Sequence, residues 1–441
     1  MAGEDANGGR QAALSEAPPA DAAPVGASGR LVALDFIRGV AVLGILFANI
    51  VAFSHPHLAY DWPRALPNAL EPADKAVWLA QYLLIDGKMR GLFALLFGAG
   101  LVLFAERARA RGAWLQLRRL FWLALFGLAH FFLLFWGDIL FLYAISGVAA
   151  LLFLGLSARR LLALGIVWHV CGGLFLAAAH WAPADAELNA ASRPELHAYA
   201  DTLAAWWQDK ENEARAETKI FREGSYGDQV AFVAEKRAPL LRQYPTLALI
   251  ETIPLMLIGM ALYRFGLFAG RSPPGEDEAE DWPDPRAMRG WAWAGVIAGI
   301  ALTLPLGLWA MMTDFPPFLT EFVFNGAPHV LRLPMILGLA VLLAAWAPHA
   351  AHGWLGERLI AAGRMAFSNY VGTSILMMLV FRGWAGGLFG QLDRVELLVA
   401  VALGWAVMLR WSKPWLARYR YGPLEWCWRC LSYWQRFPLR R

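Results

Sequence analysis

The chain has 441 residues, of which 58% are hydrophobic and only 17% are charged. A soluble domain of this size would not stay in solution with so few charges, so the composition predicts a protein whose solvent is the lipid bilayer. The net charge of +4 comes from Arg clusters in particular connections, which indicates contact with anionic lipid rather than with nucleic acid.

Residues 1–29 are rich in Ala, Gly and Pro and lack the basic start and short apolar core of a signal peptide, so we expect a disordered cytoplasmic tail. The rest of the chain contains about ten apolar runs, each long enough to cross a hydrocarbon core of about 30 Å. The runs lie near 31–53, 76–104, 117–136, 138–157, 160–181, 246–268, 290–312, 327–347, 364–385 and 395–412. The predicted fold is therefore all-α, a polytopic transmembrane bundle of about ten helices.

The runs group into two bundles around one polar segment. Residues 30–182 form an N-terminal bundle of five spans, whose second run is interrupted by Asp86, Lys88 and Arg90. That run is either a pair of helices or one long helix with an inward-facing polar turn. Residues 183–244 carry charges at helical spacing together with Trp206 and Trp207, which predicts an interfacial helix. A second five-span bundle occupies 245–412, and 413–441 form a cytoplasmic amphipathic tail.

The orientation follows from the Lys and Arg residues in the connections, because cytoplasmic loops carry the excess of positive charge. The second run is followed by Arg107, Arg109, Arg111, Arg118 and Arg119, and the last run is followed by Lys413, Arg418 and Arg420. Even-numbered helix ends are therefore predicted to be cytoplasmic, with both termini inside. The segment 183–244 then lies outside, and we expect a multi-pass protein of the bacterial inner membrane.

The cysteines give no sign of a metal centre. Cys427 and Cys430 form a single C-x-x-C pair, and no second Cys or His pair lies near them, whereas a zinc site needs four ligands. We expect no metal and no tightly bound cofactor.

Five motifs in the same order resemble those of the YeiB family of bacterial membrane proteins. They begin with Leu-Asp-x-x-Arg-Gly at 34–39, continue at 88–100 and 127–140, and end with Gly-Arg-Met-Ala-Phe-Ser-Asn-Tyr at 363–370 and the stretch 421–429. The resemblance covers nearly the whole chain from residue 31, and its C-terminal part corresponds to a domain of unknown function, number 418.

The first helix is also similar to that of membrane acyltransferases of the heparan glucosaminide acetyltransferase type. This resemblance implies transfer of an acyl group from a cytoplasmic donor to an acceptor across the membrane. Those enzymes place a catalytic His soon after the first span, where this chain has His55 and His57. The residues around them do not match, so no role is carried over, and we expect both to face solvent.

One set of polar residues is predicted to gather inside the membrane on its outer side. A charge inside hydrocarbon is costly, so such residues are functional candidates by default. The set comprises Asn49, Lys88, Arg90, His130, Trp136 and Asp138. We expect them to converge on one polar pocket that binds substrate.

His130 and Asp138 are the predicted catalytic residues. In the functional interpretation His130 is a general base for an acceptor hydroxyl or amine, and Asp138 orients its imidazole. In the structural interpretation His130 is satisfied by a bond between helices and Asp138 caps the next helix. Lys88 and Arg90 either hold a phosphate or an acyl carbonyl, or extend toward the membrane surface as interfacial cations.

A second set of polar residues is predicted at the cytoplasmic face. Asp35 can pair with Arg38, and Glu425 with Arg429, because each pair is about one helical turn apart. The members are Asp35, Arg38, Arg364, Asn369, Tyr370, Glu425 and Arg429. They either lock the first helix to the C-terminal helices or admit a phosphate-bearing donor such as an acyl-CoA.

Two functions follow from these patterns. The first is an acyltransferase that moves an acyl group from a cytoplasmic acyl-CoA to a small-molecule or glycan acceptor at the outer leaflet or periplasm. The second is a transporter, or a protein that binds a lipid or small solute without covalent chemistry. Membrane lipids are the expected partners, no nucleic acid is expected, and the sequence leaves open whether the chain forms a homodimer.

Overall fold

The computed structural model describes residues 31–108, 112–268 and 284–441. The predicted cytoplasmic tail at 1–29 lies outside the described residues. Within them the chain is helical and contains no strand, apart from an isolated bridge between Tyr419 and Arg440. The predicted all-α fold is confirmed.

The long helices are α1 (Val32–Ser54), α3 (Pro72–Leu84), α4 (Lys88–Ala108), α5 (Gly112–Leu133), α6 (Leu140–Ala150), α7 (Ala158–Asn189), α8 (His197–Glu223), α11 (Ile253–Arg264), α12 (Arg289–Met312), α15 (Leu333–Ala350), α16 (Trp354–Arg364), α17 (Ala366–Phe381), α18 (Arg394–Arg418) and α19 (Pro423–Tyr433). Shorter helices include α2 (Leu58–Asp61), α9 (Tyr226–Phe232) and α13 (Pro317–Glu321).

Among the described residues, seven helical stretches are long and apolar enough to cross a membrane. The number rises to eight when α16 and α17, which meet at 89°, are taken as one bent span. The polytopic bundle is therefore confirmed, whereas a total of about ten spans stays a prediction. The second predicted run is a pair of helices, because the chain breaks between α3 and α4 at Gly87, which has a positive φ of 75°.

Glycines bring the central helices into direct backbone contact. A Cβ on Gly363 of α16 would lie 1.8 Å from the carbonyl oxygen of Asp35 in α1, and one on Gly39 would lie 2.0 Å from that of Leu359. Helices in lipid associate mainly through van der Waals contact, because lipid is as apolar as the helix surface. Small residues strengthen this contact by letting the two backbones approach closely. The start of α1 is therefore held firmly against α16.

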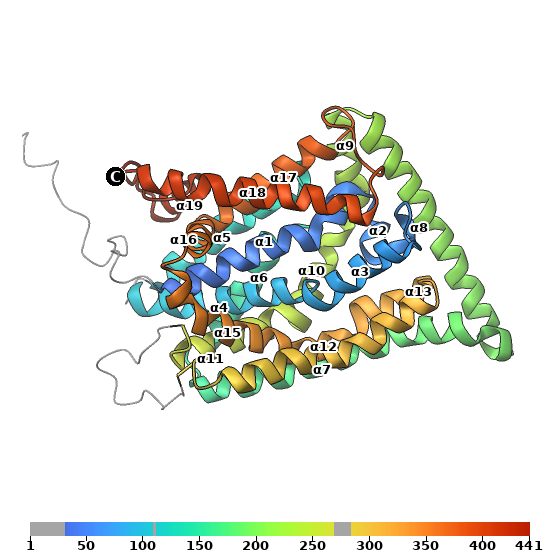
Figure 1. The fold of residues 1–441 in the computed structure, drawn as a ribbon, viewed down its shortest axis with the longest axis horizontal. Coiled ribbons are helices and arrows are strands. Elements are labelled where there is room, and N and C mark those ends of the chain that lie inside the picture. Colours follow the sequence, from blue (N-terminus) through green and yellow to red (C-terminus); the bar gives the residue numbers. More distant parts are fainter. Residues whose placement is uncertain (1–30, 109–111, 269–283) are drawn as a thin grey trace, which may run out of the picture.

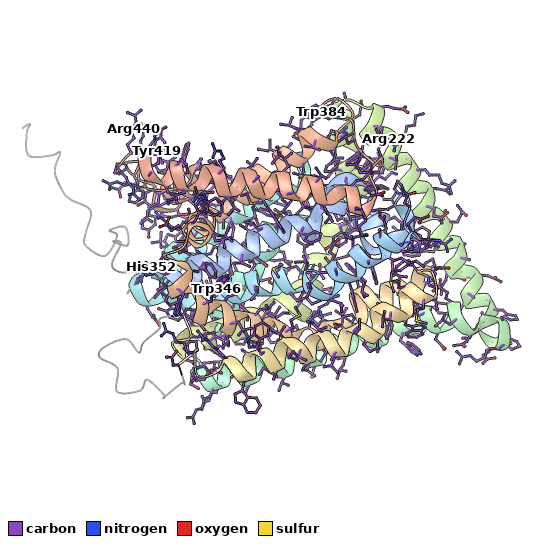
Figure 2. The ribbon with its side chains drawn as sticks, viewed as in Figure 1. Arg222, Trp346, His352, Trp384, Tyr419 and Arg440 are labelled. Carbon is purple, nitrogen blue, oxygen red and sulfur yellow. The ribbon has the colours of Figure 1, made fainter. Side chains whose placement is uncertain are left out.

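The first and last described segments lie at the same end of the bundle, and α8 runs across the opposite end (Figure 1). The figure's side chains mark these two ends: Tyr419, Arg440 and His352 lie at one and Arg222 and Trp384 at the other (Figure 2). Arg222 of α8 donates hydrogen bonds to the carbonyl oxygens of Phe389 and Gly390 at 2.7 and 2.6 Å. The helix α7 continues to Asn189, beyond the predicted boundary at 182.

Candidate functional site

His130 and Asp138 are in direct contact. His130 lies in the last turn of α5, and Asp138 lies in the short connection that leads into α6. The His130 Nδ1 and the Asp138 Oδ2 are 2.8 Å apart, and the two side chains are 1% and 0% exposed. The second oxygen of Asp138 accepts a hydrogen bond from the backbone N–H of Phe141 at 2.8 Å, so the carboxylate also caps the start of α6.

The other nitrogen of the His130 ring contacts a residue that the sequence analysis missed. The Nε2 atom is 2.8 Å from the hydroxyl oxygen of Ser374, which lies in α17. A carboxylate can only accept, so Nδ1 carries the proton and Nε2 accepts from the Ser374 hydroxyl. A single Ser in an apolar run gives no sequence signal. Ser374 is 244 positions from His130 in the sequence, and only the fold brings the two together.

Tyr370 covers the His130 ring. It lies one turn before Ser374 in α17, and the two ring centroids are 4.9 Å apart. Its hydroxyl accepts from the backbone N–H of Ile139 at 3.2 Å and lies 3.4 Å from the carbonyl oxygen of Gly137. The contact fixes the connection that carries Asp138 against α17.

A cavity of about 270 Å³ extends between Tyr370 and one end of the bundle. Most of its wall is apolar, and its charged residues are Arg38, Arg119, Arg364 and Glu425. These four lie at the ends of α1, α5, α16 and α19 that we predict to be cytoplasmic. We call this group the cationic mouth. A second, water-sized cavity of about 10 Å³ lies beside Tyr370 and is lined by Asn49, Phe53 and Thr373 among others.

Arg119 is the mouth residue best placed to meet an anion. Its guanidinium lies 4.1 Å from the ring centroid of Phe104 and 4.7 Å from that of Trp428. No carboxylate pairs with it within the part of the chain that the structure describes. Arg38 differs, because it pairs with Asp35 at 3.0 Å as the sequence predicted.

Two members of the cytoplasmic set hold helices together rather than lining the cavity. The Asn369 Nδ2 donates to the Ala362 carbonyl oxygen at 3.0 Å and its Oδ1 accepts from Trp411 at 2.8 Å, which joins α16, α17 and α18. Arg429 lies over the rings of Tyr421, Tyr433 and Phe437.

Glu425 does not pair with Arg429, so that predicted salt bridge is wrong. Its carboxylate instead accepts from the backbone N–H groups of Phe367 and Ser368 at 2.9 and 3.1 Å and from the Ser368 hydroxyl. The carboxylate therefore satisfies the free N–H groups at the start of α17, where the helix dipole favours negative charge. Burial raises the pKa of Glu425 above its usual value.

Lys88 and Arg90 lie apart from the His130 site. Arg90 forms a two-point salt bridge to Glu251 with both distances at 2.8 Å. Lys88 is buried and donates to the carbonyl oxygen of Tyr82. The structure thus gathers His130, Asp138 and Asn49 around Tyr370 and places the two cations elsewhere, so the predicted single pocket holds only part of its set.

Trp136 and the two histidines after α1 form a separate contact. The ring centroids of Trp136 and His57 are 4.4 Å apart, and the two rings are tilted by 53°. His55 is 1% exposed and its Nδ1 lies 2.8 Å from the Ser54 hydroxyl, so the expectation that it faces solvent is wrong. Burial lowers the pKa of both histidines to about 3, which keeps them neutral at pH 7. Among the described residues no group of three or more His, Cys, Asp or Glu residues could hold a metal.

The fold and this site define a multi-pass helical membrane protein with a cavity that ends at Tyr370, whose ring contacts the His130 of a buried Asp–His pair. The chain is 31% identical over 408 residues to the uncharacterised protein YeiB of Escherichia coli K12, which covers 91% of this chain and 96% of that protein. It is 27% identical over 419 residues to the uncharacterised protein YxaH of Bacillus subtilis 168, covering 92% and 95% of the two chains. The chain belongs to the YeiB family.

A family model described as "Protein of unknown function (DUF418)" matches residues 280–435. That stretch contains α16 to α19, and with them Arg364, Tyr370, Ser374 and Glu425. His130, Asp138 and Arg119 lie before it. No solved structure matches the chain.

Proposed function

We propose that the protein is an acyltransferase of the bacterial inner membrane. It would take the acyl group of a cytoplasmic acyl-CoA and pass it to a small-molecule or glycan acceptor at the outer leaflet or periplasm. The observation that supports this proposal most is the cavity, because it extends from a cationic mouth to Tyr370, and the Tyr370 ring also contacts His130. One cavity could therefore hold both the phosphate end and the acyl end of an acyl-CoA.

The mouth fits the phosphates of the donor. Guanidinium groups bind phosphate oxygens through directed hydrogen bonds, and Arg119 has no carboxylate partner among the described residues to satisfy it. The apolar wall, which includes Phe93, Leu96 and Leu120, fits an acyl chain. A ligand with a charged head and an apolar tail matches both parts of the cavity.

The Asp138–His130 pair supplies the base that acyl transfer needs. A carboxylate hydrogen-bonded to Nδ1 fixes the imidazole tautomer and stabilises the imidazolium that forms when Nε2 takes a proton. The pair is buried, so its hydrogen bonds do not compete with water.

The proposal is tested with purified protein in liposomes and a panel of acyl-CoA donors from acetyl to palmitoyl, by measuring release of free CoA thiol in the presence of membrane extract as acceptor source. We expect His130→Gln to reduce release by about 10²–10⁴-fold, the usual contribution of a general base. His169→Gln is the matched control, since His169 is also 1% exposed and hydrogen-bonded in a helix interior. Equal rates for the two variants would exclude His130 as the base.

A second candidate function is proton-linked movement of a lipid or small solute. The rings of His169 and His329 are stacked at 4.4 Å, and each buried ring has one nitrogen without a hydrogen-bond partner among the described residues. Titratable groups held inside a membrane protein are typical of proton paths. This function predicts that liposomes show acyl-CoA-independent proton uptake, read by an internal pH dye, which His329→Gln abolishes and His130→Gln does not.

A further inference from the structure

We infer that Ser374 is the nucleophile that carries the acyl group during transfer, which rests on the proposed acyltransferase function. Asp138, His130 and Ser374 form one hydrogen-bonded chain with both links at 2.8 Å. The three residues come from the α5–α6 connection, α5 and α17. This is the arrangement in which a carboxylate orients an imidazole and the imidazole activates a hydroxyl.

Both ring nitrogens of His130 already have hydrogen-bond partners, and this leads to the assignment. Its Nδ1 is held by Asp138 and its Nε2 by Ser374. A substrate hydroxyl therefore has no free nitrogen to approach, and the hydroxyl placed to lose its proton to His130 is that of Ser374. If His130 acts as a base, its first product in this geometry is an activated serine.

The hydrogen bonds of other buried serines show that Ser374 is unusual. A serine inside an apolar helix normally donates to the carbonyl oxygen four residues earlier. Ser412 and Ser432 do so at 2.7 and 2.6 Å. Ser374 lies 3.3 Å from the carbonyl oxygen of Tyr370 and 2.8 Å from the His130 ring, so its shorter contact is with the imidazole.

Tyr370 lies between Ser374 and the donor cavity. It lines both the large cavity and the water-sized one, and Thr373, the residue before Ser374, also lines the small one. The hydroxyl of Tyr370 has two long contacts: the one at 3.2 Å is at the upper limit for an N–H···O hydrogen bond, and the one at 3.4 Å is longer than a usual O–H···O bond. Neither His130 nor Ser374 lines either of these two cavities, so the proposed transfer requires Tyr370 to rotate and open a path from the donor cavity to the Ser374 oxygen.

The chemistry balances without any further reactant. The Ser374 oxygen attacks the thioester carbonyl carbon while His130 Nε2 takes the hydroxyl proton, the C–S bond breaks, and the thiolate leaves with that proton as free CoA thiol. An acceptor hydroxyl then attacks the Ser374 ester and gives its proton to His130. The C–O bond to Ser374 breaks, and the serine recovers its proton.

The nucleophile can be tested without knowing the natural donor. Purified protein is treated with a long-chain alkyl fluorophosphonate, whose phosphorus bonds to an activated serine oxygen as fluoride leaves, and the adduct is located by peptide mass spectrometry. We expect an adduct on Ser374, formed about 10²–10⁴-fold more slowly in His130→Gln and at the unchanged rate in His169→Gln. No adduct on Ser374, or an equal rate in the two His variants, would overturn the inference.

An assay of acyl transfer then distinguishes failure of the Ser374 assignment from failure of the proposed acyltransferase function. Ser374→Ala should abolish release of CoA thiol, whereas Ser412→Ala, another buried helical serine, should keep it. Ser374→Cys should form a thioester that neutral hydroxylamine cleaves, a change of linkage that a structural role would not produce. If Ser374→Ala releases thiol like the unmodified protein, the nucleophile is disproved and the acyltransferase stands. If Ser374 is labelled but no acyl-CoA is consumed, the acyl-CoA function is disproved.

Discussion

Asp138 fixes the protonation of the site at the scale of single residues. Its carboxylate accepts from His130 Nδ1, which leaves Nε2 free of a proton and able to receive one. The same carboxylate caps α6 through Phe141. One carboxylate therefore makes both of the contacts that the sequence suggested for it, the helix cap and the bond to His130, while its part in catalysis stays a prediction.

Replacing Asp138 with Asn should remove activity while the fold persists. The amide NH₂ of Asn would donate to Nδ1 and shift the ring proton to Nε2, so that His130 can no longer accept from Ser374. We expect a loss of CoA release on the order of 10³–10⁴-fold. Gel filtration in detergent checks the fold. A rate within a few-fold of the unmodified protein would contradict the assigned tautomer.

Arg119 should decide how well the donor binds. Arg119→Gln removes one charge-assisted hydrogen bond, worth about 1.5–3 kcal/mol, so KM for acyl-CoA should rise about ten- to hundredfold with little change in kcat. Arg160→Gln is the control, because Arg160 is exposed at the start of α7 and does not line the cavity. Equal KM values for the two variants would show that the phosphates bind elsewhere.

Two carboxyl groups outside the membrane-spanning helices should make stability depend on pH. Burial, and then the nearby charge of Asp61, raise the pKa of Glu321 to about 7, and burial raises that of Asp61 to about 6. The pKa of Glu in an unfolded chain is about 4.3. Between that pH and the raised pKa of Glu321, the folded state holds a proton that the unfolded state lacks. Stability should therefore rise as pH falls from about 8 to about 5, and Glu321→Gln should flatten the Tm profile.

The sequence predicts the charged residues of the site better than its neutral ones. His130 and Asp138 are conspicuous because ionisable groups in apolar runs are costly, and their short separation in sequence makes contact easy. A serine in an apolar helix costs little free energy, because its hydroxyl can bond to the helix backbone. The sequence around Ser374 therefore does not indicate a functional residue. The pairing of Glu425 was wrong because a spacing of four residues permits a salt bridge, while the free N–H groups of α17 offered a better partner.

At the scale of elements, the contact between α1 and α16 forms one side of the mouth. Arg38 directly precedes Gly39 and Arg364 directly follows Gly363, and these two glycines let the helices touch. Apolar run length located most helices, but it could not show that α16 and α17 meet at 89°, because α1 packs against α16 and α18 is hydrogen-bonded to α17, and both contacts are distant in sequence. Nor could it choose between one helix and two at Gly87, where the side chain of Arg332 fills the break.

Gly363→Ala should separate α1 from α16. Its new Cβ would lie 1.8 Å from the Asp35 carbonyl oxygen, so the helices must move apart at a cost of about 1–3 kcal/mol. Gly372→Ala in α17 meets nothing within 4 Å and should instead stabilise the helix by about 0.5–1 kcal/mol. Thermal unfolding in detergent measures both, and a Gly363→Ala variant as stable as Gly372→Ala would contradict the close packing.

At the scale of the whole molecule, the described ends of the chain lie together and α8 lies at the far end (Figure 1). This arrangement agrees with the orientation predicted from Arg and Lys, and it places the cationic mouth on the predicted cytoplasmic side. The donor would then enter on one side, and the acceptor would meet the acyl group after it passes Tyr370.

A structure of the protein with a non-hydrolysable thioether analogue of an acyl-CoA tests the central claim most directly. We predict phosphate density beside Arg119 and the acyl chain along the α4–α5 wall, with the thioether end at Tyr370. Binding of the analogue outside this cavity, or an acyl chain that ends far from Tyr370 and His130, would contradict the account.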